Sequence, residues 1–243
     1  MNESTPQRHA KKWVGGALLA FPLLIQIPYG MLIATYEYPA ILRQPAEAIL
    51  TKFAAGGPSL IAAWYLYGAA ILPLLLALAA LPGVVRARHP WLLEAVTRVG
   101  VVSAVVQMIG LLRWVFAVPP LAAAFTDPAV TPAVRSAVIV SFNTQHQLFG
   151  VMLGEHLGQL LLAVWTIGVV LSLPVHTMLD RVRFGLGLLA AILFLIGLGD
   201  GLATVATLPV NVSAAPGIAF LIWSVWCCVL GWTVWRGAEV VAR

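Results

Sequence analysis

The stretch SLIAAWYLYGAAILPLLLALAAL, residues 59–81, decides the fold, because it carries no charged side chain along its whole length. A transmembrane helix needs about 20 consecutive apolar residues to cross the hydrocarbon core of a bilayer. A transmembrane β-strand would instead show alternating polar and apolar residues over about 10 positions. Residues 59–81 are continuously apolar and rich in Leu and Ala, so we predict one membrane-spanning helix here.

The rest of the chain has the same character. Of its 243 residues, 61% are hydrophobic and only 9% are charged, and the mean hydropathy is +0.95. A soluble domain averages about 25% charged residues, so the lipid bilayer is predicted to be the main solvent of this chain. We therefore predict an all-α polytopic bundle of about six transmembrane helices, over residues 13–36, 59–81, 96–118, 132–173, 184–208 and 216–235.

The predicted domain organisation is simple. Residues 1–12 form a cytoplasmic N-terminal tail, 13–236 a single transmembrane helical domain, and 237–243 a cytoplasmic C-terminal tail. The first apolar run is too long for the core of a signal peptide, so we expect it to remain as a helix. Lys and Arg are concentrated in the segments that this topology places inside, which predicts that both termini are cytoplasmic. The net charge of +5 reflects this bias. The sequence has no basic run with interleaved aromatics, so we predict no nucleic-acid partner.

Local signals predict three helix boundaries. Pro45 can open a short helix that Gly56 and Gly57 can end. Thr131 and Pro132 are typical of an N-cap and a first helical residue. A straight helix over 132–173 would be about 60 Å long, twice the thickness of the hydrocarbon core. We therefore expect its first third to lie outside the membrane or to bend.

Polar residues inside the predicted helices indicate a site. A charge at the bilayer centre costs about 2.5–3.5 kcal/mol on insertion scales, so such residues are functional by default. The topology places them in the outer half or middle of the membrane, around a predicted ligand-binding pocket that opens to the extracytoplasmic side. Its predicted lining is Arg113, Asn143, His146, Glu155, His156, Gln159 and Asp200.

The charges and glycines of this set lead to two further expectations. One Arg beside two carboxylates leaves excess negative charge, which a protonated His, a protonated carboxyl or a bound cation could balance. The stripe of Gly150, Gly154 and Gly158 allows close approach of another helix and could also support oligomerisation. Glycines around Asp200 are expected to bring that residue towards the helix over 132–173.

Several functions remain open. The first choice is binding or transport of an unknown small molecule or ion. The second is a membrane enzyme with Glu155, His156 and Asp200 as metal ligands or acid–base groups, although no HExxH spacing is present. A b-type cytochrome is disfavoured because His146 and His156 lie about 15 Å apart on one helix. The fourth possibility is an accessory subunit whose polar network is purely structural.

Three blocks of sequence resemble a known family. They are residues 38–65, with Tyr38-Pro39, Arg43 and Trp64-Tyr65, then residues 111–119 around Arg113-Trp114, and Gly154-Glu155-His156-Leu157-Gly158-Gln159. Together they resemble a family of bacterial multi-pass membrane proteins known only as a domain of unknown function. The resemblance implies a bacterial inner-membrane location and about the topology predicted above. It implies no activity, cofactor or functional residue.

Overall fold

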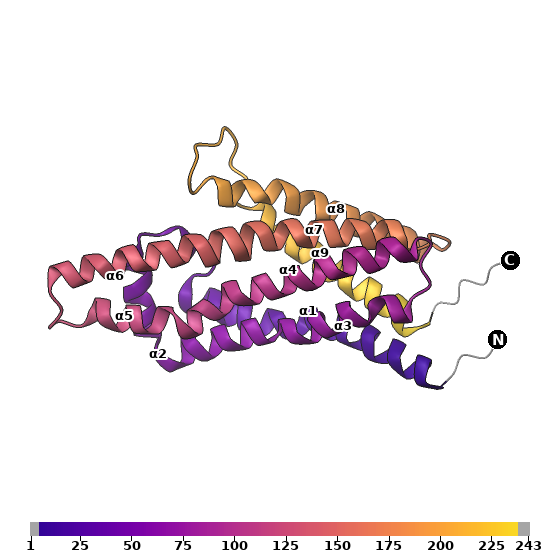
Figure 1. Cartoon of the computed structure of the whole chain (residues 1–243), viewed down its shortest axis with the longest axis horizontal. Coiled ribbons are helices and arrows are strands. Elements are labelled where there is room, and N and C mark those ends of the chain that lie inside the picture. The colour runs from indigo at the N-terminus through magenta and orange to yellow at the C-terminus, as the bar shows by residue number, and fades with distance from the viewer. Residues whose placement is uncertain (1–4, 238–243) are drawn as a thin grey trace. The chain divides into compact units, whose positions relative to one another are not determined.

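The computed structural model describes residues 5–237 of the chain. Helices make up most of this part, and no strand occurs in it, as Figure 1 shows. Two short elements are not α-helical: η1 is a 3₁₀ turn and η2 is a π-helical segment. In chain order the elements are α1 (Thr5–Tyr36), η1 (Ala40–Arg43), α2 (Ala46–Ala69), α3 (Ile71–Val84), α4 (Pro90–Phe116), α5 (Val118–Thr126), α6 (Pro132–Gln145), η2 (His146–Leu157), α7 (Gly158–Ser172), α8 (Met178–Leu202) and α9 (Ala215–Trp235).

Six helical runs within residues 5–237 are long and apolar enough to cross a membrane. They are Thr5–Tyr36, Ala46–Val84, Pro90–Thr126, Pro132–Ser172, Met178–Leu202 and Ala215–Trp235. The prediction of an all-α, polytopic membrane protein is therefore confirmed.

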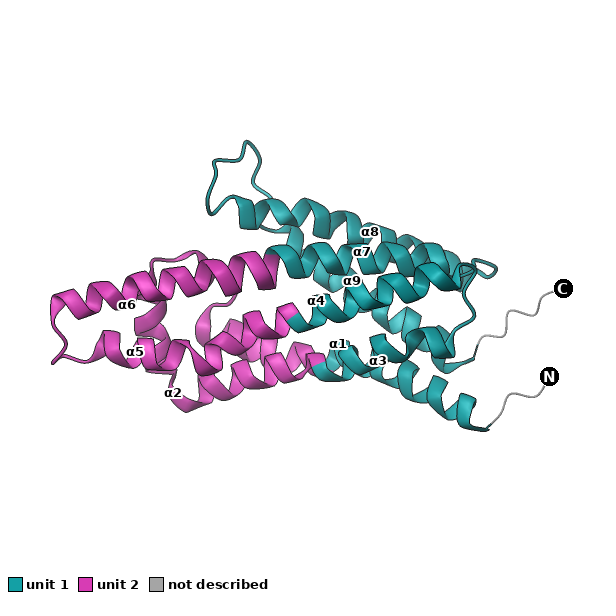
Figure 2. Cartoon of the chain, in the orientation of Figure 1, with its two compact units in different colours: residues 1–23, 72–105, 156–243 teal, residues 24–71, 106–155 magenta. Residues whose placement is uncertain are grey.

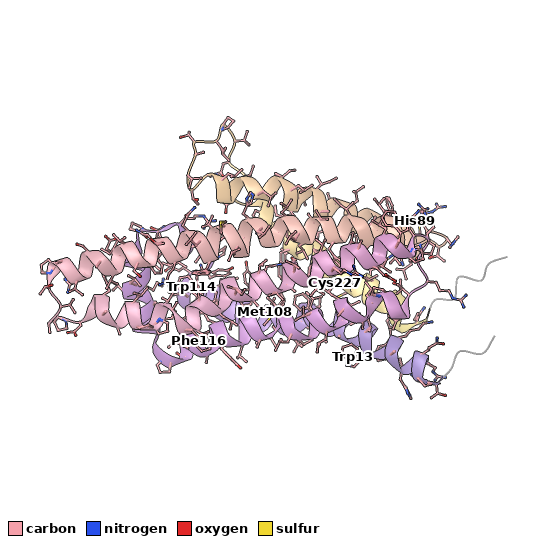
Figure 3. The ribbon with its side chains drawn as sticks, in the orientation of Figure 1. Trp13, His89, Met108, Trp114, Phe116 and Cys227 are labelled. Atoms are coloured by element: carbon pink, nitrogen blue, oxygen red, sulfur yellow. The ribbon has the colours of Figure 1, made fainter. Side chains whose placement is uncertain are left out.

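The faces of α4 illustrate how the helices suit a lipid environment. Trp114 is 1% exposed, whereas Phe116 is 72% exposed (Figure 3). Two positions along an α-helix correspond to a rotation of about 200°, so these two side chains point to nearly opposite sides. Large apolar side chains are also exposed elsewhere, including Leu23 at 70% and Ile27 at 64%. In water such surface would be costly, whereas lipid chains solvate it.

The predicted helix boundaries near Pro45 and Thr131 are confirmed. Pro45 is the N-cap of α2, and Gly57 interrupts this helix with φ 56° and ψ −153°. That φ lies in the left-handed region, where only glycine is free of strain. Thr131 caps α6, its hydroxyl oxygen accepting from the backbone N–H of Val134 at 3.4 Å.

Other boundaries differ from the predicted ones. Helix α8 begins at Met178 rather than at 184, because Thr177 and Asp180 form a capping box. The Asp180 N–H donates to the Thr177 hydroxyl at 3.2 Å, and the Asp180 carboxylate accepts from the Thr177 N–H at 2.9 Å. Helix α1 begins at Thr5, within the expected N-terminal tail. Residues 1–4 and 238–243 of the expected tails lie outside the described residues.

The helices form two compact units, which Figure 2 colours separately. Unit 1 comprises residues 1–23, 72–105 and 156–243. In it α8 packs against both α7 and α9. Its core contains Trp165, Trp223 and Trp226, whose ring centroids lie 5.3–6.2 Å apart. The Trp223 indole N–H donates to the buried hydroxyl of Thr166 at 3.0 Å.

Unit 2 comprises residues 24–71 and 106–155. In it α2 contacts α5 and α6, and α5 contacts α6. Its core is also aromatic: Trp64 and Trp114 stack with centroids 4.8 Å apart and an interplanar angle of 11°. Tyr36, which is fully buried, meets both rings edge-on. Such aromatic pairs add about 0.5–1.5 kcal/mol each beyond the area they bury, so this core holds the chain segments around Arg113 firmly in place.

Candidate functional site

Arg113 is the buried charge at the centre of the candidate site. It lies in the last turn of α4, and the residue is 8% exposed. One Nη donates to the carbonyl oxygen of Gly110, and the guanidinium carbon lies 5.0 Å from the centre of the Trp114 ring, a cation–π contact. The Nε atom is buried and has no hydrogen-bond partner among the described residues. Arg113 therefore presents a charged donor that still lacks an acceptor.

His146, the first residue of η2, is held between two partners. Its Nε2 lies 3.1 Å from the carbonyl oxygen of Leu42, and its Nδ1 lies 3.5 Å from an Nη of Arg113. A carbonyl oxygen can only accept, so Nε2 carries the proton and donates it to Leu42. A guanidinium can only donate, so Nδ1 is the unprotonated nitrogen. These contacts fix a neutral imidazole, which adds no charge to the site.

Arg43 and Glu155 form the part-exposed side of the site. Nη2 of Arg43 lies 2.6 Å from Oε2 of Glu155, and the two side chains are 32% and 24% exposed. Arg43 ends η1, whereas Glu155 belongs to η2, so the pair joins the segment after α1 to the π-helical segment. Both groups are near enough to Arg113 to interact with it electrostatically. The Glu155 carboxylate is therefore shared between a direct partner, Arg43, and a more distant one, Arg113.

Three tyrosines lie beside this group of charges. The ring centroids of Tyr29, Tyr38 and Tyr67 are 5.6–5.9 Å from one another. Tyr38 also meets the Trp64 ring edge-on at 5.2 Å. Burial, and to a lesser degree the Glu155 carboxylate, raises the pKa of the Tyr38 phenol above its ordinary value. The phenol therefore stays protonated at neutral pH and remains a hydrogen-bond donor.

Two of the predicted glycines make room for Arg113 and for the approach of η2 to α4. A Cβ on Gly150 would collide with the guanidinium of Arg113. A Cβ on Gly110 would lie 2.9 Å from the Cα of Gly154 and 2.9 Å from the carbonyl oxygen of Phe149. The stripe predicted on the sequence thus packs against α4 of the same chain, and oligomerisation through it stays a prediction.

The π-helical segment changes the face relationships expected from the sequence. On an α-helix, Gln145 and His156 would be separated by about three turns and would share a face. The structure has i→i+5 turns over His146–Leu157, which are wider than α-helical turns. The α-helical relation between Gln145 and His156 therefore does not apply to this segment. π-Helical turns are rare and often occur at functional sites, and this segment of 12 residues carries both His146 and Glu155.

The predicted site residues divide between the two units. Arg113, His146 and Glu155 come together in unit 2, whereas Asn143 is exposed on α6. The remaining three belong to unit 1, namely His156, Gln159 and Asp200.

Within unit 1, the buried atoms Nδ1 of His156 and Oε1 of Gln159 have no partner among the described residues. Asp200 is half-buried and lines a cavity of about 520 Å³. The polar residues that line this cavity with it are Thr207, Asn211 and Ser213, all from the α8–α9 connection.

The side chains in the described part of the chain do not support a metal centre. Among the residues that the structure describes, no group of three or more His, Cys, Asp and Glu side chains could hold a metal ion. Glu155, which was expected to be a metal ligand, accepts from Arg43 instead.

Three residues that matter in unit 2 were missing from the predicted lining. They are Arg43, Tyr38 and Trp64. All three belong to residues 38–65, the first of the sequence blocks that resembled a known family. That resemblance was the one signal in the sequence that could have pointed to them. The positions of Tyr38 and Arg43 depend on the path of residues 37–45, which no helical periodicity reveals.

The chain belongs to the family described as a domain of unknown function, DUF4386, whose pattern matches residues 13–237. The resemblance noted in the sequence is thereby confirmed. No curated protein and no solved structure matches the chain. The family adds no activity, so any function has to be argued from the site itself.

Proposed function

We propose that this chain is a bacterial inner-membrane protein that binds a small solute at the Arg113 cluster of unit 2. This cluster comprises Arg113, His146, Glu155, Arg43 and Tyr38. The observation that carries the proposal is the Nε of Arg113, which is buried and unpaired among the described residues. Buried polar groups are nearly always hydrogen-bonded in folded proteins, and those that are not need an explanation. A network that served only helix packing would satisfy this donor, whereas a binding site keeps it for a ligand.

The solute reaches the cluster from its part-exposed side. Arg43 and Glu155 are 32% and 24% exposed, whereas Arg113 is 8% exposed. With both termini in the cytoplasm, residues 37–45 lie on the extracytoplasmic side. A solute would thus enter past the Arg43–Glu155 ion pair, and transport would require a second route from the cluster to the cytoplasm. No observation on the described residues favours the metal-dependent enzyme over binding.

The orientation can be tested with single cysteines in a Cys227→Ala, Cys228→Ala background. We expect a membrane-impermeant maleimide to label Ala129→Cys in intact cells, because residues 127–131 are extracytoplasmic in this topology. His89→Cys, between α3 and α4, is expected to react only after the cells are opened. Labelling with the opposite sidedness would place residues 37–45 and the entrance to the cluster in the cytoplasm, against the proposal.

Ligand binding itself can be tested by mass spectrometry of small molecules that co-purify with the protein in a neutral detergent. We expect the wild type to carry a solute that is reduced at least tenfold in Arg113→Gln. Arg135→Gln is the matched control, because the Arg135 guanidinium is in the same unit and donates to the carbonyl oxygens of Phe125 and Asp127. Identical small-molecule contents in all three proteins would contradict the proposal.

A further inference from the structure

We infer that the solute bound at the Arg113 cluster carries an anionic oxygen group of the carboxylate class. This inference rests on the proposed function, which leaves the chemistry of the solute open. It opposes the bound cation that the sequence suggested as one way to balance the charges.

The first observation is the kind of polar atom left unpaired in unit 2. Buried side-chain atoms without a partner there are Nε of Arg113, Nε1 of Trp64 and Oε1 of Gln145. The guanidinium and the indole can only donate. Both belong to one stack, in which Trp64 lies on Trp114 and the Arg113 guanidinium lies on the Trp114 ring. Two unsatisfied donors in one stack require an acceptor, and a charged acceptor makes the stronger hydrogen bond with a guanidinium.

The second observation is the balance of charge. Arg43, Arg113 and Glu155 interact electrostatically, and His146 is neutral. Glu155 is engaged directly by Arg43 at 2.6 Å, so Arg113 is the cation without a carboxylate of its own. An uncompensated buried charge is costly, and an anion bound at Arg113 would neutralise it.

The third observation limits the size of the anionic group. Arg113 is enclosed by the Trp114 ring, by His146 and by Gly150, where even a Cβ would collide with it. The free donor is a single Nε edge rather than the whole guanidinium fork. A planar carboxylate can approach such an edge through one oxygen and offer its second oxygen to another donor, and the Trp64 indole N–H is the other unpaired buried side-chain donor described in unit 2.

The test compares two small solutes that have nearly the same shape and differ in charge. Acetate and its neutral isostere acetamide are titrated into the detergent-purified protein at constant ionic strength, with ethylammonium as a cationic probe, and thermal unfolding is followed. We expect a dissociation constant for acetate at least tenfold below that for acetamide. At tenfold excess over that constant, the melting temperature should rise by about 3–5 °C.

The variants identify the group responsible. Arg113→Gln is expected to abolish the preference for acetate, and Arg135→Gln to keep it. Arg113→Lys keeps the charge but removes the Nε donor, and is expected to weaken acetate binding at least fivefold. Gly150→Ala, which displaces the guanidinium without changing any charge, provides a second check should Arg113→Gln fail to fold.

The outcomes separate the two proposals. Binding of acetamide or ethylammonium that depends on Arg113, without a preference for acetate, would overturn the anionic class but retain a binding site. No stabilisation by any of the three probes would overturn both proposals. A parallel experiment in nanodiscs distinguishes a lipid head group from a free solute. Stabilisation by phosphatidylglycerol over phosphatidylcholine, lost in Arg113→Gln, would show that a lipid phosphodiester supplies the anion and would overturn the carboxylate class.

Discussion

A chain in which Glu155 is replaced by Arg is expected to lose about 2–3 kcal/mol of stability, because three guanidinium groups would then share the interior of unit 2. Removing one partner of a fully buried ion pair costs about 3–5 kcal/mol. The Arg43 and Glu155 side chains are 32% and 24% exposed, so water screens part of this cost. The free energy of unfolding, measured by denaturant titration in mixed micelles, gives the size of the loss.

Exchanging the charges of Arg43 and Glu155 tests whether the lost stability comes from this ion pair. Arg43→Glu combined with Glu155→Arg restores an ion pair across the same 2.6 Å contact, so more than half of the lost stability should return. The pair between Lys52 and Glu37 is a matched control at 2.5 Å, since Glu37 is 71% exposed. Reversing Glu37 to Lys should cost less than about 1 kcal/mol. A double exchange at 43 and 155 that is no more stable than Glu155→Arg alone would show that the two residues do not act as a pair.

The membrane architecture follows from the sequence because its cause is local. A helix such as residues 59–81 needs no partner to identify it, since continuous apolar character and length suffice. Capping residues are local as well, so Thr131 and Pro132 predicted the start of α6. The start of α8 was placed too late because Arg181 and Arg183 were assigned to a loop. The capping box at Thr177 and the ion pair between Arg183 and Asp180 at 3.1 Å stabilise residues 178–183 as the first turns of α8.

The contacts of the candidate site were predicted only in part because they depend on tertiary structure. The cost of a buried charge singled out Arg113 and Glu155 without any structure. Their neighbours could not be found in the same way, since Arg43 reaches Glu155 across 112 positions of sequence. The π-helical segment was also invisible, because no periodicity in His146–Leu157 distinguishes it from an α-helix. The sequence therefore did not show that Arg43, rather than Arg113, is the direct partner of Glu155.

Gly110→Ala is expected to lower both the stability of unit 2 and its affinity for acetate. The new Cβ would lie 2.9 Å from the Cα of Gly154 and from the carbonyl oxygen of Phe149, and backbone atoms cannot move aside without shifting a helix. Overpacking of this kind costs about 1–3 kcal/mol. Alanine would return up to about 1 kcal/mol through its better helix propensity, so we expect a net loss of about 1–2 kcal/mol.

The loss of affinity follows from a shared backbone group. The carbonyl oxygen of Gly110 accepts from Arg113, so a shift of α4 away from η2 also moves the guanidinium relative to His146. We expect at least a fivefold weaker affinity for acetate, measured by the same thermal titration. Gly30→Ala is the control within unit 2, because a Cβ there meets nothing within 4 Å and should be neutral or stabilising. If Gly110→Ala behaved like Gly30→Ala, the close approach of η2 to α4 would not be what positions Arg113.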